Sequence, residues 1–168
     1  EVQQLRLLTR RRKAYTERIT QCKNEIHNIL QRANIKLTSY LSDIYGLTGM
    51  ALLEMFINGE VITEETDLPK IHGRIKATVD QLVEAMDGKL SIEDRFLLGQ
   101  SLEHYRHLVN QVDEITVVIK RYVLERFERK YNLLIELPGV SAIVAFVILS
   151  EIGPNVEAFQ SQGNLASW

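Results

Sequence analysis

The sequence predicts an all-α protein, and three features point to that class. Only three of the 168 residues are proline and nine are glycine, while 45% are hydrophobic. A chain of this length buries roughly 70% of its unfolded surface, so it can form one hydrophobic core. Two long segments also repeat apolar residues at alternating steps of three and four. We expect long coiled-coil-forming helices with a short helical insert, followed by a C-terminal helix-hairpin-helix-like segment.

The first long helix is predicted over residues 5–33. A helix of this length is about 43 Å long, too long to cover one small core by itself, so it requires a partner helix. Arg12 is the polar residue in the apolar stripe of this helix. Its aliphatic stem can pack against the partner helix, and a polar residue at such a position can fix the register of the helix pair. The single cysteine, Cys22, is expected to be a small buried hydrophobe. The first seam consists of Leu5, Leu8, Arg12, Tyr15, Ile19, Cys22, Ile26, Ile29 and Ala33.

The insert is predicted to start where this pattern breaks, at residue 34. One or two helical turns are expected over Tyr40–Tyr45, and Gly46 and Gly49 bracket a turn. A short helix with Met50, Leu53, Phe56 and Ile57 on one stripe then stops at Asn58-Gly59.

An acidic stretch follows the insert and is assigned to a solvent loop. It comprises Glu54, Glu60, Glu64, Glu65 and Asp67. Asp67 is a predicted N-cap of a helix over Leu68–Met86, which Gly88 ends.

The second long helix begins at Ser91, a favourable N-cap followed by two acidic residues that suit a helix dipole. Its seam could meet the first seam antiparallel, either within one chain or between two copies, and the pattern alone does not choose. The second seam consists of Leu98, Leu102, Tyr105, Val109, Val112, Thr116, Ile119 and Val123.

The C-terminal segment predicts two helices joined by a tight hairpin at Pro138-Gly139-Val140. Ser141 caps an apolar helix that continues through Ile152 and ends at Gly153-Pro154. Such a hairpin can aim backbone N–H groups at a phosphate, so Gly139, Val140 and Ser141 are candidate nucleic-acid contacts. Ser141 replaces the usual second glycine and Ile143 stands where a basic residue is expected, which favours a packing hairpin over a phosphate clamp.

Charge is concentrated at the N-terminal end. Residues 1–36 carry nine Lys/Arg against three Glu, although the whole chain has a net charge of −2. This end is a candidate polyanion contact, and a solvated helix face is an equally weighted alternative. The candidate nucleic-acid contacts are Arg10, Arg11, Arg12, Lys13, Arg18 and Lys23.

The sequence offers no catalytic constellation and no metal site. His104 and His107 share a helix face without a third partner, and the acidic stretch lacks the spacing of a calcium loop. The longest apolar run, Ala142–Leu149, is only eight residues, so no membrane span is predicted. One cysteine and no signal peptide favour the cytoplasm. We expect an excerpt of a longer protein, because no methionine opens the chain and the pattern is interrupted at Trp168.

Two stretches resemble the transposases of bacterial insertion-sequence family one-hundred-and-ten. The first resembles the middle of these proteins and comprises residues 26–37, Leu41-Ser42-Asp43-Ile44-Tyr45-Gly46 and Gly49-Met50-Ala51-Leu52-Leu53-Glu54. The second resembles the opening of their C-terminal domain and comprises Leu137-Pro138-Gly139-Val140, Ala145, Ser150-Glu151-Ile152-Gly153, Phe159 and Leu165-Ala166-Ser167-Trp168.

The resemblance implies a DNA recombinase guided by a bridge RNA. An RNase-H-like domain with a DEDD carboxylate set that binds Mg²⁺ would precede this excerpt, and a nucleophilic serine would follow it. Residues 1–130 would be the coiled-coil region, and residues 131–168 the start of the C-terminal transposase domain. Ser167 does not match the motif of the nucleophile, so no catalytic residue and no cofactor are assigned here.

Two functions follow as hypotheses. The first is a transposase fragment that dimerises through its heptad helices and binds DNA and RNA, without activity by itself. The alternative, from pattern alone, is a coiled-coil scaffold that binds protein partners and no nucleic acid.

Overall fold

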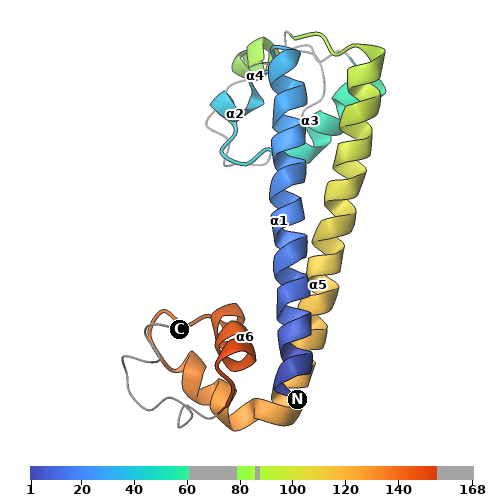
Figure 1. Ribbon diagram of the computed structural model, residues 1–168. Coiled ribbons are helices and arrows are strands. Elements are labelled where there is room, and N and C mark those ends of the chain that lie inside the picture. Colours follow the sequence, from blue (N-terminus) through green and yellow to red (C-terminus); the bar gives the residue numbers. More distant parts are fainter. Residues whose placement is uncertain (61–78, 86–87, 155–168) are drawn as a thin grey trace. The chain divides into compact units, whose positions relative to one another are not determined.

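The computed structural model describes residues 1–60, 79–85 and 88–154. All regular secondary structure within these ranges is helical, which confirms the predicted all-α class (Figure 1). None of the described helices is long and apolar enough to cross a bilayer. The helices are α1 (Val2–Arg32), α2 (Leu37–Tyr40), α3 (Leu47–Asn58), α4 (Val79–Ala85), α5 (Ile92–Ile135) and α6 (Ala142–Glu151).

The chain divides into two compact units. Unit 1 comprises Glu1–Arg18 and Leu108–Trp168, and unit 2 comprises Ile19–His107. Each unit therefore contains one part of α1 and one part of α5. The boundary expected between residues 130 and 131 falls inside α5, and its meaning as a border between family domains stays a prediction.

The core of unit 1 joins the first turns of α1, the second half of α5 and α6 (Figure 1). The Tyr131 and Phe146 rings stack with their centroids 5.6 Å apart. The backbone of α5 is non-helical at Phe127, whose side chain is buried in this core. The buried residues are Leu5, Ile119, Val123, Phe127, Tyr131, Ala145, Phe146 and Leu149.

Arg12, the polar residue of the first seam, faces Thr116, a polar residue of the second seam. Arg12 Nε donates a hydrogen bond of 2.8 Å to Thr116 Oγ1, which in turn donates to the Val112 carbonyl oxygen at 2.5 Å. A shift of one helical turn would place the Arg12 guanidinium against apolar seam residues without an acceptor. This pair therefore specifies the register of α1 against α5 in unit 1.

The core of unit 2 gathers the second half of α1, the insert and the first turns of α5. Cys22 is 2% exposed and its thiol donates to the Ser101 carbonyl oxygen at 3.2 Å, so the predicted buried cysteine is confirmed. Burial also raises the pKa of this thiol. The buried residues are Ile26, Ile29, Leu30, Ala33, Ile35, Leu37, Leu41, Ile44, Leu52, Leu53, Phe56, Leu90, Leu98 and Leu102.

The two seams meet antiparallel within each unit. In unit 1, Tyr122 Oη donates to the Glu1 carbonyl oxygen at 3.1 Å, while Arg12 lies opposite Thr116. In unit 2, Cys22 contacts Ser101, and Arg32 pairs with Asp94 at 2.9 Å. Of the two pairings that the sequence left open, this structure has the one within a single chain.

The first piece of the insert differs from its prediction. The helical turn occupies Leu37–Tyr40, so the expected turn over Tyr40–Tyr45 is wrong. Leu41 adopts extended backbone angles (φ −112°, ψ 125°) that end the turn. Beyond it, the Asp43 carboxylate accepts a hydrogen bond from the Tyr45 backbone N–H at 2.9 Å, an alternative to helical pairing.

The second piece of the insert is the predicted short helix, α3, which ends at Gly59. Gly59 has φ +73°, and the Arg95 guanidinium fills the space where a Cβ would project. Gly49 lies inside α3 and not at a turn. A Cβ on Gly49 would come within 2.2 Å of the Ile44 carbonyl oxygen, so only glycine allows this close packing.

The helix predicted over Leu68–Met86 lies partly outside the described residues, and α4 (Val79–Ala85) is its described portion. The acidic residues Glu64, Glu65 and Asp67 also lie outside. The predicted N-cap of α5 is confirmed, because the Asp94 backbone N–H donates to Ser91 Oγ at 3.0 Å.

Replacing Ile26 by alanine should lower the free energy of unfolding by about 2–5 kcal/mol, because Ile26 is fully buried and its loss leaves a cavity. Urea unfolding followed by circular dichroism measures this. Ile92 is 81% exposed, and its replacement by alanine should change the same free energy by less than about 0.5 kcal/mol. Equal effects of the two substitutions would contradict the described core.

Candidate nucleic-acid interface

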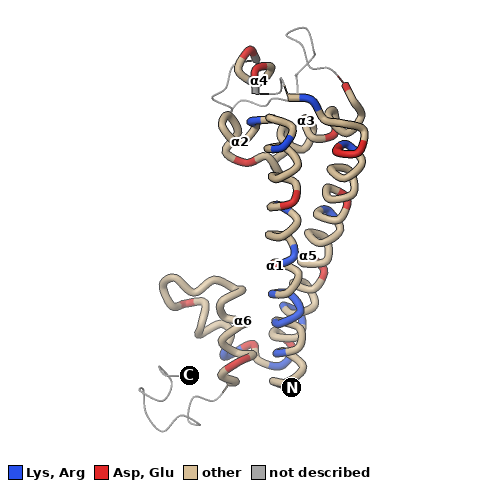
Figure 2. Tube along the Cα trace, turned by 45° about the horizontal axis from the view of Figure 1, so that its top comes forward, with Lys and Arg blue, Asp and Glu red and all other residues tan. Residues whose placement is uncertain are grey.

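Basic charge is concentrated in unit 1. Residues 1–18 carry six Lys/Arg against Glu1 and Glu17, and Figure 2 shows basic residues following one another along the first half of α1. Unit 1 as a whole has eleven Lys/Arg and nine Asp/Glu, whereas unit 2 has nine and thirteen. The positive potential that a polyanion would meet therefore belongs to unit 1.

The basic run Arg10–Lys13 does not form one continuous face. Successive helix residues are rotated by about 100°, so four consecutive side chains point in different directions. Arg10 pairs with Glu151 of α6, and Arg12 bonds to Thr116 of α5. Two of the four predicted contacts thus hold the unit together in this structure.

Three other basic residues of α1 in unit 1 are exposed. Arg11 lies 5.8 Å from the Tyr15 ring centroid, and Lys13 makes only a long contact with Glu17, at 3.9 Å. Arg18 is exposed and lies seven residues after Arg11, on the same side of the helix. Arg11, Lys13 and Arg18 remain available to a phosphate backbone, and that contact stays a prediction.

Lys23 belongs to unit 2 and has aromatic partners. Its ammonium lies 4.5 Å from the Tyr45 ring centroid and 5.7 Å from that of Tyr105. Tyr45 Oη donates to the Lys23 carbonyl oxygen at 3.1 Å, and burial raises the pKa of Tyr45. This cation–π arrangement accounts for Lys23 as a packing residue of unit 2.

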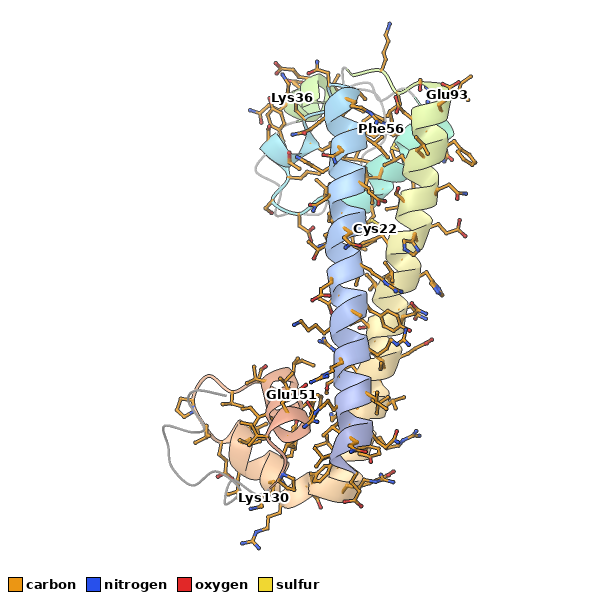
Figure 3. All side chains as sticks on the ribbon, viewed as in Figure 1. Cys22, Lys36, Phe56, Glu93, Lys130 and Glu151 are labelled. Atoms are coloured by element: carbon orange, nitrogen blue, oxygen red, sulfur yellow. The ribbon has the colours of Figure 1, made fainter. Side chains whose placement is uncertain are left out.

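The C-terminal end of α6 is held against α1 by five residues, which we call the α6 clasp: Arg6, Thr9, Arg10, Ser150 and Glu151. The guanidinium of Arg6 donates to the carbonyl oxygens of Ser150 and Glu151, both at 3.0 Å. Arg10 donates two hydrogen bonds of 3.0 Å to the Glu151 carboxylate. Thr9 Oγ1 donates to Ser150 Oγ at 3.0 Å in a buried contact. Figure 3 shows Glu151 where α6 approaches α1.

The α6 clasp supplies hydrogen-bond partners for the C-terminal end of α6. The last carbonyl groups of a helix lack intrahelical partners, and here a guanidinium from another helix satisfies two of them. The hydrogen bond from Arg10 lowers the pKa of Glu151, and the charges of Arg10, Arg6 and Lys13 lower it further. The same bond raises the pKa of Arg10. The carboxylate therefore stays ionised to a lower pH than that of an ordinary glutamate.

The predicted hairpin between α5 and α6 has the expected tight turn. The Val140 N–H donates to the Leu137 carbonyl oxygen at 3.1 Å, and Gly139 has φ +84°. Ser141 Oγ accepts a hydrogen bond from the Val144 N–H at 3.3 Å, and Val140 packs against the core of unit 1. Ser141 thus caps α6 as predicted, and a phosphate contact by Gly139, Val140 or Ser141 stays a prediction.

Six cations of unit 1 have neither an ion pair nor a hydrogen bond among the residues that the structure describes. Two lie on α1 and four on α5, and all are exposed. In Figure 3 the Lys130 side chain extends away from the ribbon. The six are Arg11, Arg18, Lys120, Arg121, Arg129 and Lys130.

No group of three or more metal-ligating side chains occurs within residues 1–60, 79–85 and 88–154. His104 and His107 are exposed on α5, as expected of surface residues on a long helix.

Comparison of this chain with models of known protein families, with curated proteins and with solved structures gives no match. The site must therefore be interpreted from its own geometry. Sequence reasoning missed the α6 clasp residues Arg6, Thr9, Ser150 and Glu151, and the four exposed cations of α5, Lys120, Arg121, Arg129 and Lys130. Arg6 and Glu151 are 145 positions apart, and no local pattern signals their contact.

The contribution of the clasp to stability should depend on pH. Because the folded protein lowers the pKa of Glu151, the contribution is fully present above the ordinary value of 4.5 and is lost as the pH falls through the depressed value. We expect the loss of stability on acidification to be smaller in Glu151→Gln than in the unsubstituted protein. Thermal unfolding between pH 7 and pH 3 measures the difference, and parallel pH profiles would contradict the assignment.

Proposed function

We propose that this chain is the nucleic-acid-binding and assembly part of a transposase of insertion-sequence family one-hundred-and-ten. The observation that supports it best is the set of six exposed cations on α1 and α5 of unit 1. None of these six cations is paired with a carboxylate among the described residues, whereas Arg6 and Arg10 are paired with Glu151. Exposed cations on helices suit a phosphate backbone, because they can replace its condensed counterions.

The binding would be insensitive to sequence. Lys and Arg contacts to phosphates fix position and orientation but do not distinguish bases. In the proposed assembly, the bridge RNA selects the target site, and this chain binds the phosphate backbone of the DNA or RNA. The carboxylates with Mg²⁺ and the nucleophilic serine implied by the resemblance belong to other parts of the protein. The proposed location is the cytoplasm.

A second candidate is a scaffold that binds proteins, and apolar exposure around α6 favours it. Val144 and Val147 of α6 are 42% and 46% exposed, and Leu133 and Leu137 before it are 52% and 53% exposed. Residues 137–150 contain no charge at all. A surface of this kind fits another apolar surface and not a polyanion.

The nucleic-acid proposal predicts that the basic residues of unit 1 determine how strongly binding depends on salt. The chain should bind a 20-base-pair duplex or a structured RNA. Replacing Arg11 and Arg18 by glutamine should lower the slope of log affinity against log salt by about 1.8, or about 0.9 for each lost phosphate contact on duplex DNA. Fluorescence anisotropy at several salt concentrations measures the slope.

A matched control removes the same charge from unit 2. Lys36 and Lys89 are both exposed there, and their replacement by glutamine should leave the slope nearly unchanged. Binding that is absent, or that does not depend on salt, would reject the nucleic-acid proposal and leave the scaffold.

Self-association through the two long helices is a further part of the proposal. Because the seams face each other within one chain, contact between copies would use the outward faces, where Leu7, Val117 and Leu124 are 64%, 69% and 37% exposed. A twofold dimer suits a recombinase that treats two DNA ends alike. Sedimentation velocity should show a dimer that Val117→Glu with Leu124→Glu converts to a monomer of unchanged helicity. A monomer at every concentration would contradict it.

A further inference from the structure

We propose that Arg6 and Arg10 form a phosphate-binding site that Glu151 occupies in the free protein, and that a phosphate backbone displaces the Glu151 carboxylate. This inference rests on the proposed nucleic-acid binding and adds its regulation. It makes the α6 clasp a contact that competes with the ligand, so that binding on α1 is coupled to the docking of α6.

The geometry of the clasp is that of an occupied oxyanion site. Arg10 presents two parallel N–H groups, each 3.0 Å from a different oxygen of Glu151. Arg6 Nε lies 3.2 Å from one of the same oxygens. The planar guanidinium fork matches carboxylate and phosphate equally well. The Glu151 carboxylate therefore occupies the place that a phosphate oxygen pair would take.

Charge favours the exchange. Arg6, Arg10 and Lys13 all lower the pKa of Glu151, so three cations act on a single carboxylate. Glu151 balances only one of these three positive charges, and Glu17 makes only a long contact of 3.9 Å with Lys13. A phosphodiester backbone supplies several negative charges in a row and can satisfy more than one of these cations at once.

The site is accessible from the Arg10 side. The Arg10 side chain is 65% exposed, whereas those of Arg6 and Glu151 are 34% and 21% exposed. A ligand can therefore contact Arg10 before α6 moves. Because the Arg10 side chain reaches solvent, water and salt screen its ion pair with Glu151, so a polyanion can compete for this contact.

Displacement has a local consequence for α6. Glu151 is the last residue of the helix, and Arg6 also donates to the carbonyl oxygens of Ser150 and Glu151. When a phosphate takes over Arg10 and part of Arg6, the last turn of α6 loses its capping partner. Thr9 and Ser150 remain as the buried contact between the two helices. The effect is therefore a loosening of the last turn and not the release of the whole helix.

The first test compares two charge-neutralising variants of the full chain. Glu151→Gln removes the competing carboxylate and should raise the affinity for a 20-base-pair duplex about two- to fivefold, the range expected when a weak surface ion pair no longer competes. Glu128→Gln is the control, because Glu128 is an exposed residue of α5 that has no ion pair among the described residues. It changes the net charge equally and should leave the affinity nearly unchanged.

The second test follows α6 directly in the unsubstituted protein. Hydrogen exchange of the peptide covering residues 142–154 should become faster when the duplex is bound, because the capping contacts are lost. In Glu151→Gln the same peptide should exchange fast already and respond little to the duplex. This measurement separates displacement from a general electrostatic gain, which would raise affinity without changing α6.

A third measurement distinguishes free phosphate from a nucleic-acid backbone as the ligand of this site. Inorganic phosphate at the same phosphate concentration accelerates exchange of this peptide if any free phosphate binds the site. An effect of the duplex alone assigns the site to a nucleic-acid backbone. Both results support a phosphate site, and no acceleration with either ligand overturns it.

The failure of this inference differs from the failure of the proposed function. If no variant binds duplex or RNA, the proposed function fails. If the duplex binds with the predicted salt dependence while Glu151→Gln has unchanged affinity and α6 is unaffected, only the inference fails. The exchange measurement on the unsubstituted protein applies even if Glu151→Gln disturbs folding, which circular dichroism would reveal.

Discussion

The antiparallel contact between the seams of α1 and α5 is the constraint on which each unit depends. Apolar side chains at steps of three and four place one stripe of each helix against the other, and burial of these stripes stabilises the pair. The hydrogen bond between Arg12 and Thr116 adds a specific register in unit 1, because an arginine in an apolar seam needs an acceptor. With the register fixed, Leu5 enters the same core as Ile119 and Val123.

The register also decides which cations are available. It directs Arg12 to α5, and it leaves Arg6, Thr9 and Arg10 on the side of α1 where α6 docks. Basic residues at neighbouring sequence positions thereby acquire different roles: some hold helices together, and others face solvent. The net positive charge of residues 1–18 is therefore a poor guide to the charge that a ligand meets, which is carried by the residues without internal partners.

Unit 2 uses its polar residues differently. Its sequence has more acidic than basic residues, and its cation Lys23 packs on the rings of Tyr45 and Tyr105. Two glycines shape the insert for different reasons. A Cβ at Gly49 would meet the Ile44 backbone, and Gly59 has a φ of +73°, a conformation that residues with a side chain rarely adopt.

The sequence by itself determined the helical class, both seams, the burial of Cys22 and the caps at Ser91 and Ser141, because periodicity and capping depend on residues within a few positions of one another. It placed the turn at Tyr40–Tyr45 wrongly, since Asp43 offers the backbone a competing hydrogen bond that periodicity does not register. Only the tertiary structure decided that the seams pair within the chain and that Arg10 meets Glu151. These contacts join residues more than 100 positions apart, and their partners are chosen by the packing of whole helices.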